Sequence, residues 1–183
     1  MRITGGKYCG RTVKVTEGDL RIRPAMDRMR ESVFAVLGNL TGLSFCDLFA
    51  GSGIIGLEAA SRGAYPVVCI EKDRKKFPTL LENANIADPP IQCRAMPAET
   101  FILRNRTPFD IVFLDPPFDY RFKLELLERL ARSPSLHEKS FVLIHFPAED
   151  RLPEQVGNLH AEDTRIYGRS LVRFYRRRGS SPA

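Results

Sequence analysis

The sequence predicts an α/β protein with a mostly parallel, doubly wound sheet of seven strands and helices on both faces. Short apolar runs alternate with longer amphipathic stretches along most of its 183 residues, which is the pattern of repeated strand–helix units. Several of these runs are continuously apolar, as expected for strands that are buried on both faces. The length suggests one domain with a small appendage. We therefore expect an extension over residues 1–42, a core over 43–178 and a disordered tail over 179–183.

The elements are predicted in chain order from periodicity and from turn residues. The first 24 residues should contain a small hairpin, because glycines lie between two short candidate strands, Arg2–Thr4 and Thr12–Val15. A helix capped by Asp27 should then run to about Leu40. Further helices are expected from the glycine loop to about residue 62, over 72–87 and over 122–132, the last with Leu124, Leu127 and Leu130 facing inward. The seven strands are expected at 44–49, 67–70, 91–95, 111–114, 141–146, 165–167 and 171–175.

Composition indicates an ordinary globular chain with 43% hydrophobic and 27% charged residues. It has no apolar run near the roughly 20 residues of a membrane span and no visible signal peptide, so we expect a cytoplasmic protein without a membrane partner. Nothing in the sequence suggests an obligate dimer, and a monomer is expected. The scattered cysteines are interpreted as reduced thiols and the histidines as structural or solvated, so no metal site is predicted: Cys9, Cys46, Cys69, Cys93, His137, His145 and His160.

Charge is unevenly distributed along the chain. Residues 1–30 carry a net charge of +5, residues 31–164 a net charge of −5, and residues 165–183 a net charge of +6. Basic ends on a slightly acidic body suggest a polyanionic partner that contacts the termini. An alternative is that these side chains only favour solubility. The arginines expected to contact a nucleic acid cluster before and within the first helix: Arg21, Arg23, Arg28 and Arg30.

The stretch Asp115-Pro-Pro-Phe118 follows a short apolar run and predicts a ligand site. Its two prolines lack N–H donors and end the strand, so Asp115 lies at the carboxyl end of a buried strand, where open α/β sheets bind ligands. A carboxylate, the rigid carbonyl of Pro116 and the ring of Phe118 together suit a flat group that carries an NH2. The alternative is an ordinary turn with Phe118 in the core.

A glycine loop predicts a nucleoside-containing cofactor. Gly51-Ser-Gly-Ile-Ile-Gly56 follows a predicted strand and opens a helix, and Glu71 follows the next strand, twenty residues after Gly51. Glycines let the backbone approach the ligand, and the acid accepts ribose hydroxyls. This pattern fits a nicotinamide oxidoreductase as well as an S-adenosylmethionine enzyme. Asp47 and Ser52 suit the amino-acid group of the methyl donor. An amine methyltransferase also has a use for Asp115-Pro-Pro-Phe118, whereas an oxidoreductase has no evident need of it.

These residues carry a family resemblance that extends over residues 1–178. Asp47-Leu-Phe-Ala-Gly-Ser-Gly53 with Asp115-Pro-Pro-Phe118 looks like a class I methyltransferase acting on an exocyclic amine. With Arg23-Pro-Ala-Met-Asp-Arg-Met-Arg-Glu31, Glu58-Ala-Ala-Ser-Arg-Gly63, Glu71-Lys-Asp73 and Tyr167-Gly168, the chain resembles the bacterial 16S rRNA guanine-N2 methyltransferase family of the RsmD type. The resemblance implies a Rossmann-like class I methyltransferase fold.

The resemblance also implies S-adenosylmethionine as cofactor and ribosomal RNA as partner, within a small subunit or its assembly intermediate. It implies catalytic functions for Asp115, Pro116 and Phe118. Pro97 stands where the family commonly has Asp, so the Ala98 N–H is expected to serve the adenine ring. The cofactor-binding residues implied are Asp47, Phe49, Ala50, Gly51, Ser52, Gly53, Glu71, Lys72, Ala98 and Asp115.

Three other functions remain compatible with parts of the pattern. A DNA adenine-N6 or protein glutamine amide methyltransferase would have a similar site, but those enzymes usually carry Asn where Asp115 stands. A binding module with a degenerate cofactor loop would have no use for Asp115. A nicotinamide oxidoreductase would bind NAD rather than S-adenosylmethionine.

Overall fold

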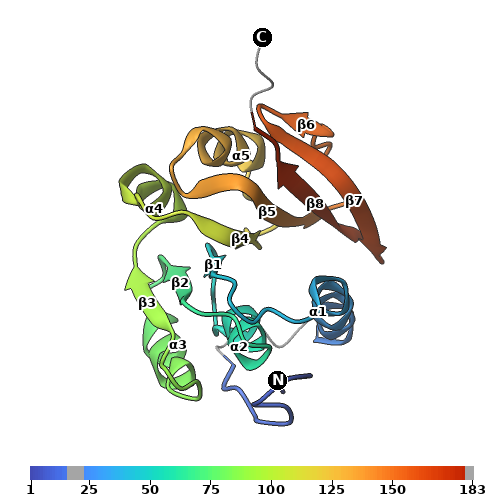
Figure 1. Ribbon diagram of the computed structural model, residues 1–183. Helices are drawn as coiled ribbons and strands as arrows, with labels where there is room; N and C mark the ends of the chain where they lie inside the picture. The colour runs from blue at the N-terminus through green and yellow to red at the C-terminus, as the bar shows by residue number, and fades with distance from the viewer. Residues whose placement is uncertain (16–22, 180–183) are drawn as a thin grey trace. The chain divides into compact units, whose positions relative to one another are not determined.

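The computed structural model describes residues 1–15 and 23–179, which belong to two compact units. The first unit comprises residues 1–98 and the second begins at residue 99. Each unit contains strands and helices of its own, coloured blue to green in the first and green to red in the second (Figure 1). The N-terminal 42 residues are part of the first unit, and residues 180–183 of the expected tail lie outside the described residues.

Three parallel strands form the sheet of the first unit. They are β1 (Phe45–Asp47), β2 (Val67–Glu71) and β3 (Gln92–Ala95), with β2 paired to both of the others. Every residue of β1 and β2 is buried, as their continuous apolar runs predict, whereas β3 is largely exposed. Because the strands are parallel, Asp47 and Glu71, the last residues of β1 and β2, both lie at carboxyl ends.

The helices of the first unit are α1 (Arg23–Leu37), α2 (Ile54–Ser61) and α3 (Phe77–Ala84). Helix α1 begins four residues before Asp27, since a proline such as Pro24 is compatible with the first turn. Helix α2 is buried almost all round, and a side chain at Gly56 would meet the Cys69 Sγ atom at 2.4 Å. This close approach explains why glycine is needed where α2 packs on β2.

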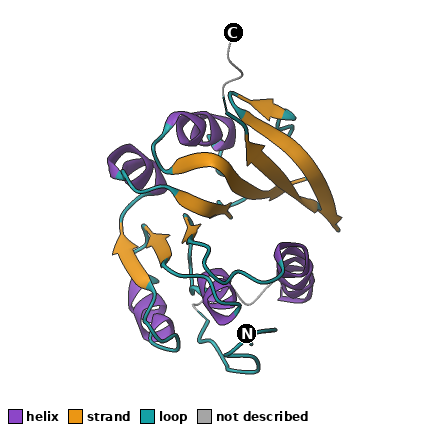
Figure 2. Cartoon of the chain, viewed as in Figure 1, coloured by secondary structure: helices purple, strands orange, loops and turns teal. Residues whose placement is uncertain are grey.

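Five strands form the sheet of the second unit: β4 (Phe109–Leu114), β5 (Leu136–Pro147), β6 (Gln155–Val156), β7 (Leu159–Tyr167) and β8 (Ser170–Arg177). Only the β4–β5 pair is parallel, while β5–β8, β8–β7 and β7–β6 are antiparallel. The long β7–β8 hairpin is plain in Figure 2. The described residues thus contain eight strands, not the expected seven, because β6 lies in a polar segment that lacks strand periodicity.

Two helices accompany these strands, α4 (Ala98–Arg104) and α5 (Lys123–Arg132). Helix α4 was not expected. In α5 the inward face is formed by Leu126, Leu127 and Leu130, whereas Leu124, expected to face inward, is 37% exposed. No helix in the described part of the chain is long and apolar enough to cross a membrane.

All four cysteines are free, which confirms their interpretation as thiols. Cys46 and Cys69 are buried in β1 and β2, and this burial raises the pKa of both thiols well above the ordinary value. Burial also raises the pKa of the Cys93 thiol to about 11. These three side chains therefore act as small apolar groups at neutral pH.

Candidate functional site

The glycine loop, residues 50–53, follows β1 and is fixed to the end of β2. The Ala50 N–H donates to the Ile70 carbonyl at 2.9 Å, and the Gly53 N–H donates back to the Ala50 carbonyl at 2.7 Å. Gly51 and Gly53 have φ angles of 53° and 84°, in the left-handed region that favours glycine. The backbone therefore folds into a tight turn immediately before α2.

Glu71 lies beside this loop and is already held in place by the backbone. Its Oε2 accepts the Gly51 N–H at 2.8 Å and its Oε1 accepts the Asp73 N–H at 2.7 Å. The side chain is only 8% exposed. Each carboxylate oxygen has a further lone pair, so the carboxylate is oriented and can still accept hydroxyl hydrogens.

Asn83, which sequence analysis did not single out, clamps the other side of the loop. Its Nδ2 donates to the Ser52 carbonyl at 2.8 Å and to the Lys14 carbonyl at 2.9 Å. Its Oδ1 accepts the Lys14 N–H at 3.0 Å, and the residue is 2% exposed. Because these bonds join α3, the loop and the N-terminal segment, only the fold could reveal the function of Asn83.

The other residues predicted to bind cofactor occupy different environments. Asp47 is buried and its Oδ1 accepts the Phe49 N–H at 3.2 Å, so it also supports the turn. Lys72 is exposed immediately after β2, and Phe49 is half-buried. Ala98 is buried and is the first residue of α4.

The glycine loop and Glu71 fit a nucleoside-containing cofactor. A Cβ atom added to Gly51 would have no heavy atom within 4 Å, so the space beside the loop is open. A fixed carboxylate next to that space can accept ribose hydroxyls, and backbone N–H groups at the start of α2 favour a negatively charged group. S-adenosylmethionine supplies both, a ribose and a carboxylate. Among residues 1–15 and 23–179, no group of His, Cys, Asp or Glu side chains could hold a metal ion.

The Asp-Pro-Pro-Phe turn, residues 115–118, belongs to the second unit and follows β4. Asp115 is partly exposed, with 22% of its side-chain area accessible, and Pro116 is buried. Phe118 is 44% exposed, so it is not a core residue. The turn continues with a hydrogen bond from the Tyr120 N–H to the Pro117 carbonyl at 2.9 Å. A carboxylate and an accessible ring are thus presented from one short, proline-stiffened segment.

His145 is a neighbour of this turn that sequence analysis treated as structural or solvated. Its Nδ1 lies 2.8 Å from the Asp115 Oδ1, and its Nε2 lies 2.8 Å from the Ser170 Oγ. The ring also meets that of Phe118 edge-on, with 5.4 Å between centroids. The signal was present in the sequence as a polar residue inside the apolar run 141–146 of β5, but its partner depended on strand register. Leu114 pairs with Ile144, which places the two following residues side by side.

Lys123, the first residue of α5, also holds the turn and was not predicted. Its Nζ donates to the carbonyls of Phe118 and Tyr120 at 2.8 and 2.7 Å and pairs with Asp150 at 2.8 Å. The lysine is 4% exposed, so this charge is satisfied inside the protein. Burial and a hydrogen bond to Glu99 raise the pKa of the Tyr120 phenol, which keeps it a donor.

The four arginines expected to contact RNA do not share one environment. Arg21 lies outside the described residues, and Arg23 begins α1 without a described side chain. Arg28 is exposed on α1, and its contact with RNA stays a prediction. Arg30 is 3% exposed and binds Asp27 at 2.9 Å and Glu58 at 3.2 Å.

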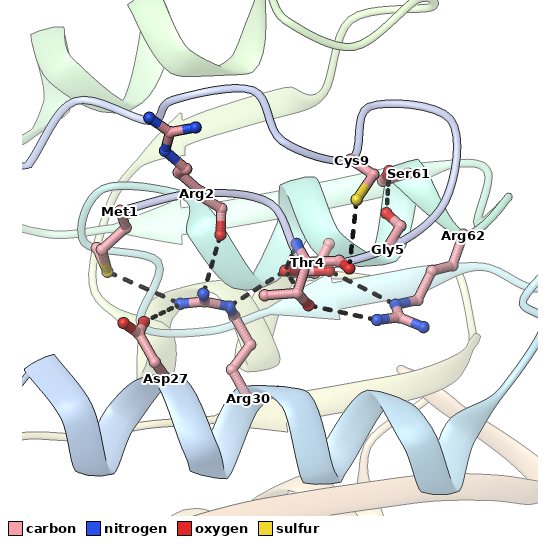
Figure 3. Close-up of polar contacts among 10 residues, drawn as sticks. Met1, Arg2, Thr4, Gly5, Cys9, Asp27, Arg30, Ser61 and Arg62 are labelled. Carbon is pink, nitrogen blue, oxygen red and sulfur yellow. Dashed lines mark hydrogen bonds and ion pairs between the residues drawn. The ribbon is translucent and has the colours of Figure 1, made fainter.

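Figure 3 shows the Arg30 guanidinium pointing from α1 toward Asp27, Met1 and the backbone of Arg2. Its Nη2 donates to the Arg2 carbonyl at 2.9 Å. These contacts turn the side chain into the protein rather than toward solvent. We therefore replace the expectation of RNA contact by Arg30 with a structural function: it joins α1 to the N-terminal segment.

Comparison with known proteins agrees with this arrangement. The family model described as "Conserved hypothetical protein 95" matches residues 1–176. The "Ribosomal RNA small subunit methyltransferase D" of Escherichia coli K12 is 33% identical over 179 residues, which covers 97% of this chain and 90% of the relative. The protein of the same name from Haemophilus influenzae is 31% identical over 154 residues, covering 79% and 77%.

The fold is shared with solved structures. The Escherichia coli protein yhhF is 32% identical, with a TM-score of 0.88 over 98% of this chain and 99% of that chain. The Thermus thermophilus protein TTHA0928 is 28% identical, with a TM-score of 0.79 over 95% and 98%. The predicted Rossmann-like α/β fold is confirmed. The chain therefore belongs to the "Conserved hypothetical protein 95" family, the RsmD-type methyltransferases.

Proposed function

We propose that this protein transfers a methyl group from S-adenosylmethionine to the exocyclic N2 amine of a guanine in small-subunit (16S) ribosomal RNA. The observation that carries the proposal is Asp115, a partly exposed carboxylate at the end of β4, on the same turn as the accessible ring of Phe118. The names of the relatives support ribosomal RNA as the substrate. The substrate would be a small subunit or its assembly intermediate, and the enzyme would act as a cytoplasmic monomer.

The turn suits a guanine amine because such an amine is a poor nucleophile. Its lone pair is delocalised into the ring, and two hydrogen-bond acceptors can draw the N–H groups into an orientation that frees it. The Asp115 carboxylate and the Pro116 carbonyl supply those acceptors. S-adenosylmethionine would supply the methyl group: the nitrogen–carbon bond would form as the carbon–sulfur bond breaks, S-adenosylhomocysteine would leave, and the proton of the amine would pass to solvent.

Phe118 would stack on the target base and fix its plane, and base stacking on an aromatic side chain contributes about 1–3 kcal/mol. The base must be unpaired or flipped out of a helix for its amine to reach Asp115. In the first unit, the glycine loop and Glu71 would hold the cofactor. Catalysis would then come mainly from positioning and from preorganised polar groups.

The test compares Asp115→Asn with the parent in single-turnover methyl transfer to small-subunit RNA or particles. The amide keeps the shape but removes the charge and presents an NH2 to the substrate amine. We expect a rate loss of at least roughly 100-fold, typical of losing one preorganised polar contact. Labelled S-adenosylmethionine gives the rate, and mass analysis should identify N2-methylguanosine.

Phe118 variants supply the matched control for base placement. Phe118→Tyr should retain most activity because the ring survives, whereas Phe118→Ala should impair both KM and kcat. A folded Asp115→Asn protein that methylates at the parent rate would refute the proposed site. Methyl groups found on adenine or on a protein amide would instead assign the enzyme to those substrates.

A further inference from the structure

A buried histidine contacts the Asp-Pro-Pro-Phe turn, and each of its two ring nitrogens lies within hydrogen-bond distance of another side chain. His145 lies in β5 and is 1% exposed. One nitrogen, Nδ1, faces Asp115, and the other, Nε2, faces Ser170 at the start of β8. β8 pairs antiparallel with residues 141–147 of β5, so Ser170 holds the histidine ring on the side opposite Asp115.

The partners of the ring determine where its proton lies. An ionised carboxylate only accepts hydrogen bonds, so the Nδ1 facing Asp115 must carry a hydrogen. The Ser170 hydroxyl also lies 3.1 Å from the Tyr167 carbonyl, and it can direct its single hydrogen either there or to Nε2. Both arrangements leave the hydrogen on Nδ1, so the bond to Asp115 does not depend on how the hydroxyl is turned.

The same ring also contacts Phe118. Its edge-on contact, with centroids 5.4 Å apart and planes at 66°, is a favourable aromatic geometry. One side chain therefore touches both groups that the proposed function assigns to the substrate amine and the base. Such contacts limit the rotamers of a partly exposed carboxylate and ring, which otherwise move freely on a turn.

We propose that His145 is a positioning residue for methyl transfer, which fixes the Asp115 carboxylate through Nδ1–H and supports the Phe118 ring with its edge. This inference rests on the proposed function and adds a residue that acts through Asp115 without touching the substrate. Ser170 contributes by contacting Nε2, the ring nitrogen that does not face Asp115.

Two substitutions of His145 test the contributions of its two ring nitrogens separately. In His145→Asn the amide nitrogen takes about the place of Nδ1 and can still donate to Asp115. In His145→Gln the amide group reaches the place of Nε2, so it can contact Ser170 but leaves no donor for Asp115. We expect the single-turnover methylation rate to fall at least tenfold further in His145→Gln than in His145→Asn, while both variants bind S-adenosylmethionine like the parent.

A second His–Asp pair in the same unit provides the control. His137 Nε2 lies 2.9 Å from Asp110 Oδ1, and His137 has 39% of its side-chain area exposed. His137→Gln should leave the methylation rate unchanged. Adding His145→Gln to Asp115→Asn should slow the reaction less than threefold beyond Asp115→Asn alone, because the histidine acts through that carboxylate. Equal rates in His145→Gln and His145→Asn, or losses that simply multiply in the double variant, would overturn the proposal.

Nuclear magnetic resonance of the parent protein tests the pairing without any activity. With 15N-labelled histidine, the His145 resonance should report a hydrogen on Nδ1 and should shift in Asp115→Asn, while that of His137 stays in place. An Nδ1 without hydrogen, or a His145 resonance that ignores Asp115→Asn, would overturn the proposal. If the parent fails to methylate guanine, the proposed function fails, and the resonance experiment still decides whether His145 positions Asp115.

Discussion

Glu71 combines two tasks in one carboxylate. Its oxygens accept the N–H groups of Gly51 and Asp73, which fixes the glycine loop to the end of β2. The same oxygens retain lone pairs for ribose hydroxyls. The loop is thus shaped before any cofactor arrives, and less conformational freedom has to be lost when the cofactor binds.

We expect Glu71→Ala to weaken S-adenosylmethionine binding. Loss of a charge-assisted hydrogen bond costs on the order of 1.5–3 kcal/mol, which corresponds to roughly 10- to 150-fold in the dissociation constant. Isothermal titration calorimetry measures this change, and circular dichroism checks the fold. Glu82→Ala is the control, because Glu82 forms an ion pair with Lys14 in which both side chains are more than half exposed. Parent-like affinity in a folded Glu71→Ala protein would remove Glu71 from the site.

Residues of the site differed in how far sequence could predict them. The exposure of Phe118 and the strand-end position of Asp115 follow from a local pattern, in which two prolines end an apolar run. The partners of His145 and Lys123 could not be predicted from the local sequence, because each side chain acquires its function from a group brought near by folding. Polar residues inside an apolar strand or helix face were the available clue.

At the scale of elements, a buried carboxylate joins the N-terminal segment to helices α1 and α2 of the first unit. Glu58 on α2 is fully buried, and its Oε1 accepts the N–H and hydroxyl of Thr4 at 2.6 and 2.7 Å. It also pairs with Arg30 of α1 at 3.2 Å and with Arg62 at 3.5 Å. The antiparallel bridge between Arg2 and Thr12 closes the segment, which confirms a small hairpin.

Glu58→Gln should therefore destabilise the protein. Removing one partner of a buried ion pair leaves the other charge uncompensated and costs about 3–5 kcal/mol. Urea unfolding of parent and variant measures the difference in free energy of unfolding. Glu82→Gln breaks a pair in which both side chains are more than half exposed, and exposed pairs contribute about 0–1 kcal/mol. Similar losses in the two variants would contradict the central position assigned to Glu58.

Sequence patterns predicted where buried strands lie better than they predicted where elements begin and end. Strong apolar runs located β1, β2, β4 and part of β5, because burial on both faces leaves a clear signature. Helix α4 has seven residues, too few for a helical period to appear. The hairpin strands β7 and β8 extend beyond their apolar centres, since antiparallel pairing continues through polar residues that face solvent.

At the scale of the whole molecule, the net charge of +6 comes from the two ends of the chain. The C-terminal arginines are partly committed to the fold: Arg176 lies over the Phe141 ring and Arg177 donates to the Leu136 carbonyl. Arg30 is likewise committed, to Glu58. The positive charge available for RNA is therefore smaller than the sequence total, and Arg28 is an exposed part of it.

We expect the triple variant with Arg21, Arg23 and Arg28 replaced by Ala to bind small-subunit RNA more weakly and with less salt dependence. Each contact with a single-stranded phosphate contributes about −0.7 to the slope of log affinity against log salt, so three contacts would flatten it by about 2. Filter binding over a range of salt concentrations measures both quantities. The control replaces Arg104, Arg129 and Arg132, which are exposed on α4 and α5, and changes the net charge equally. If RNA affinity and its salt dependence fall equally in both triple variants, the overall positive charge attracts the RNA and contact with the N-terminal arginines does not. The N-terminal assignment requires a larger loss in the first variant.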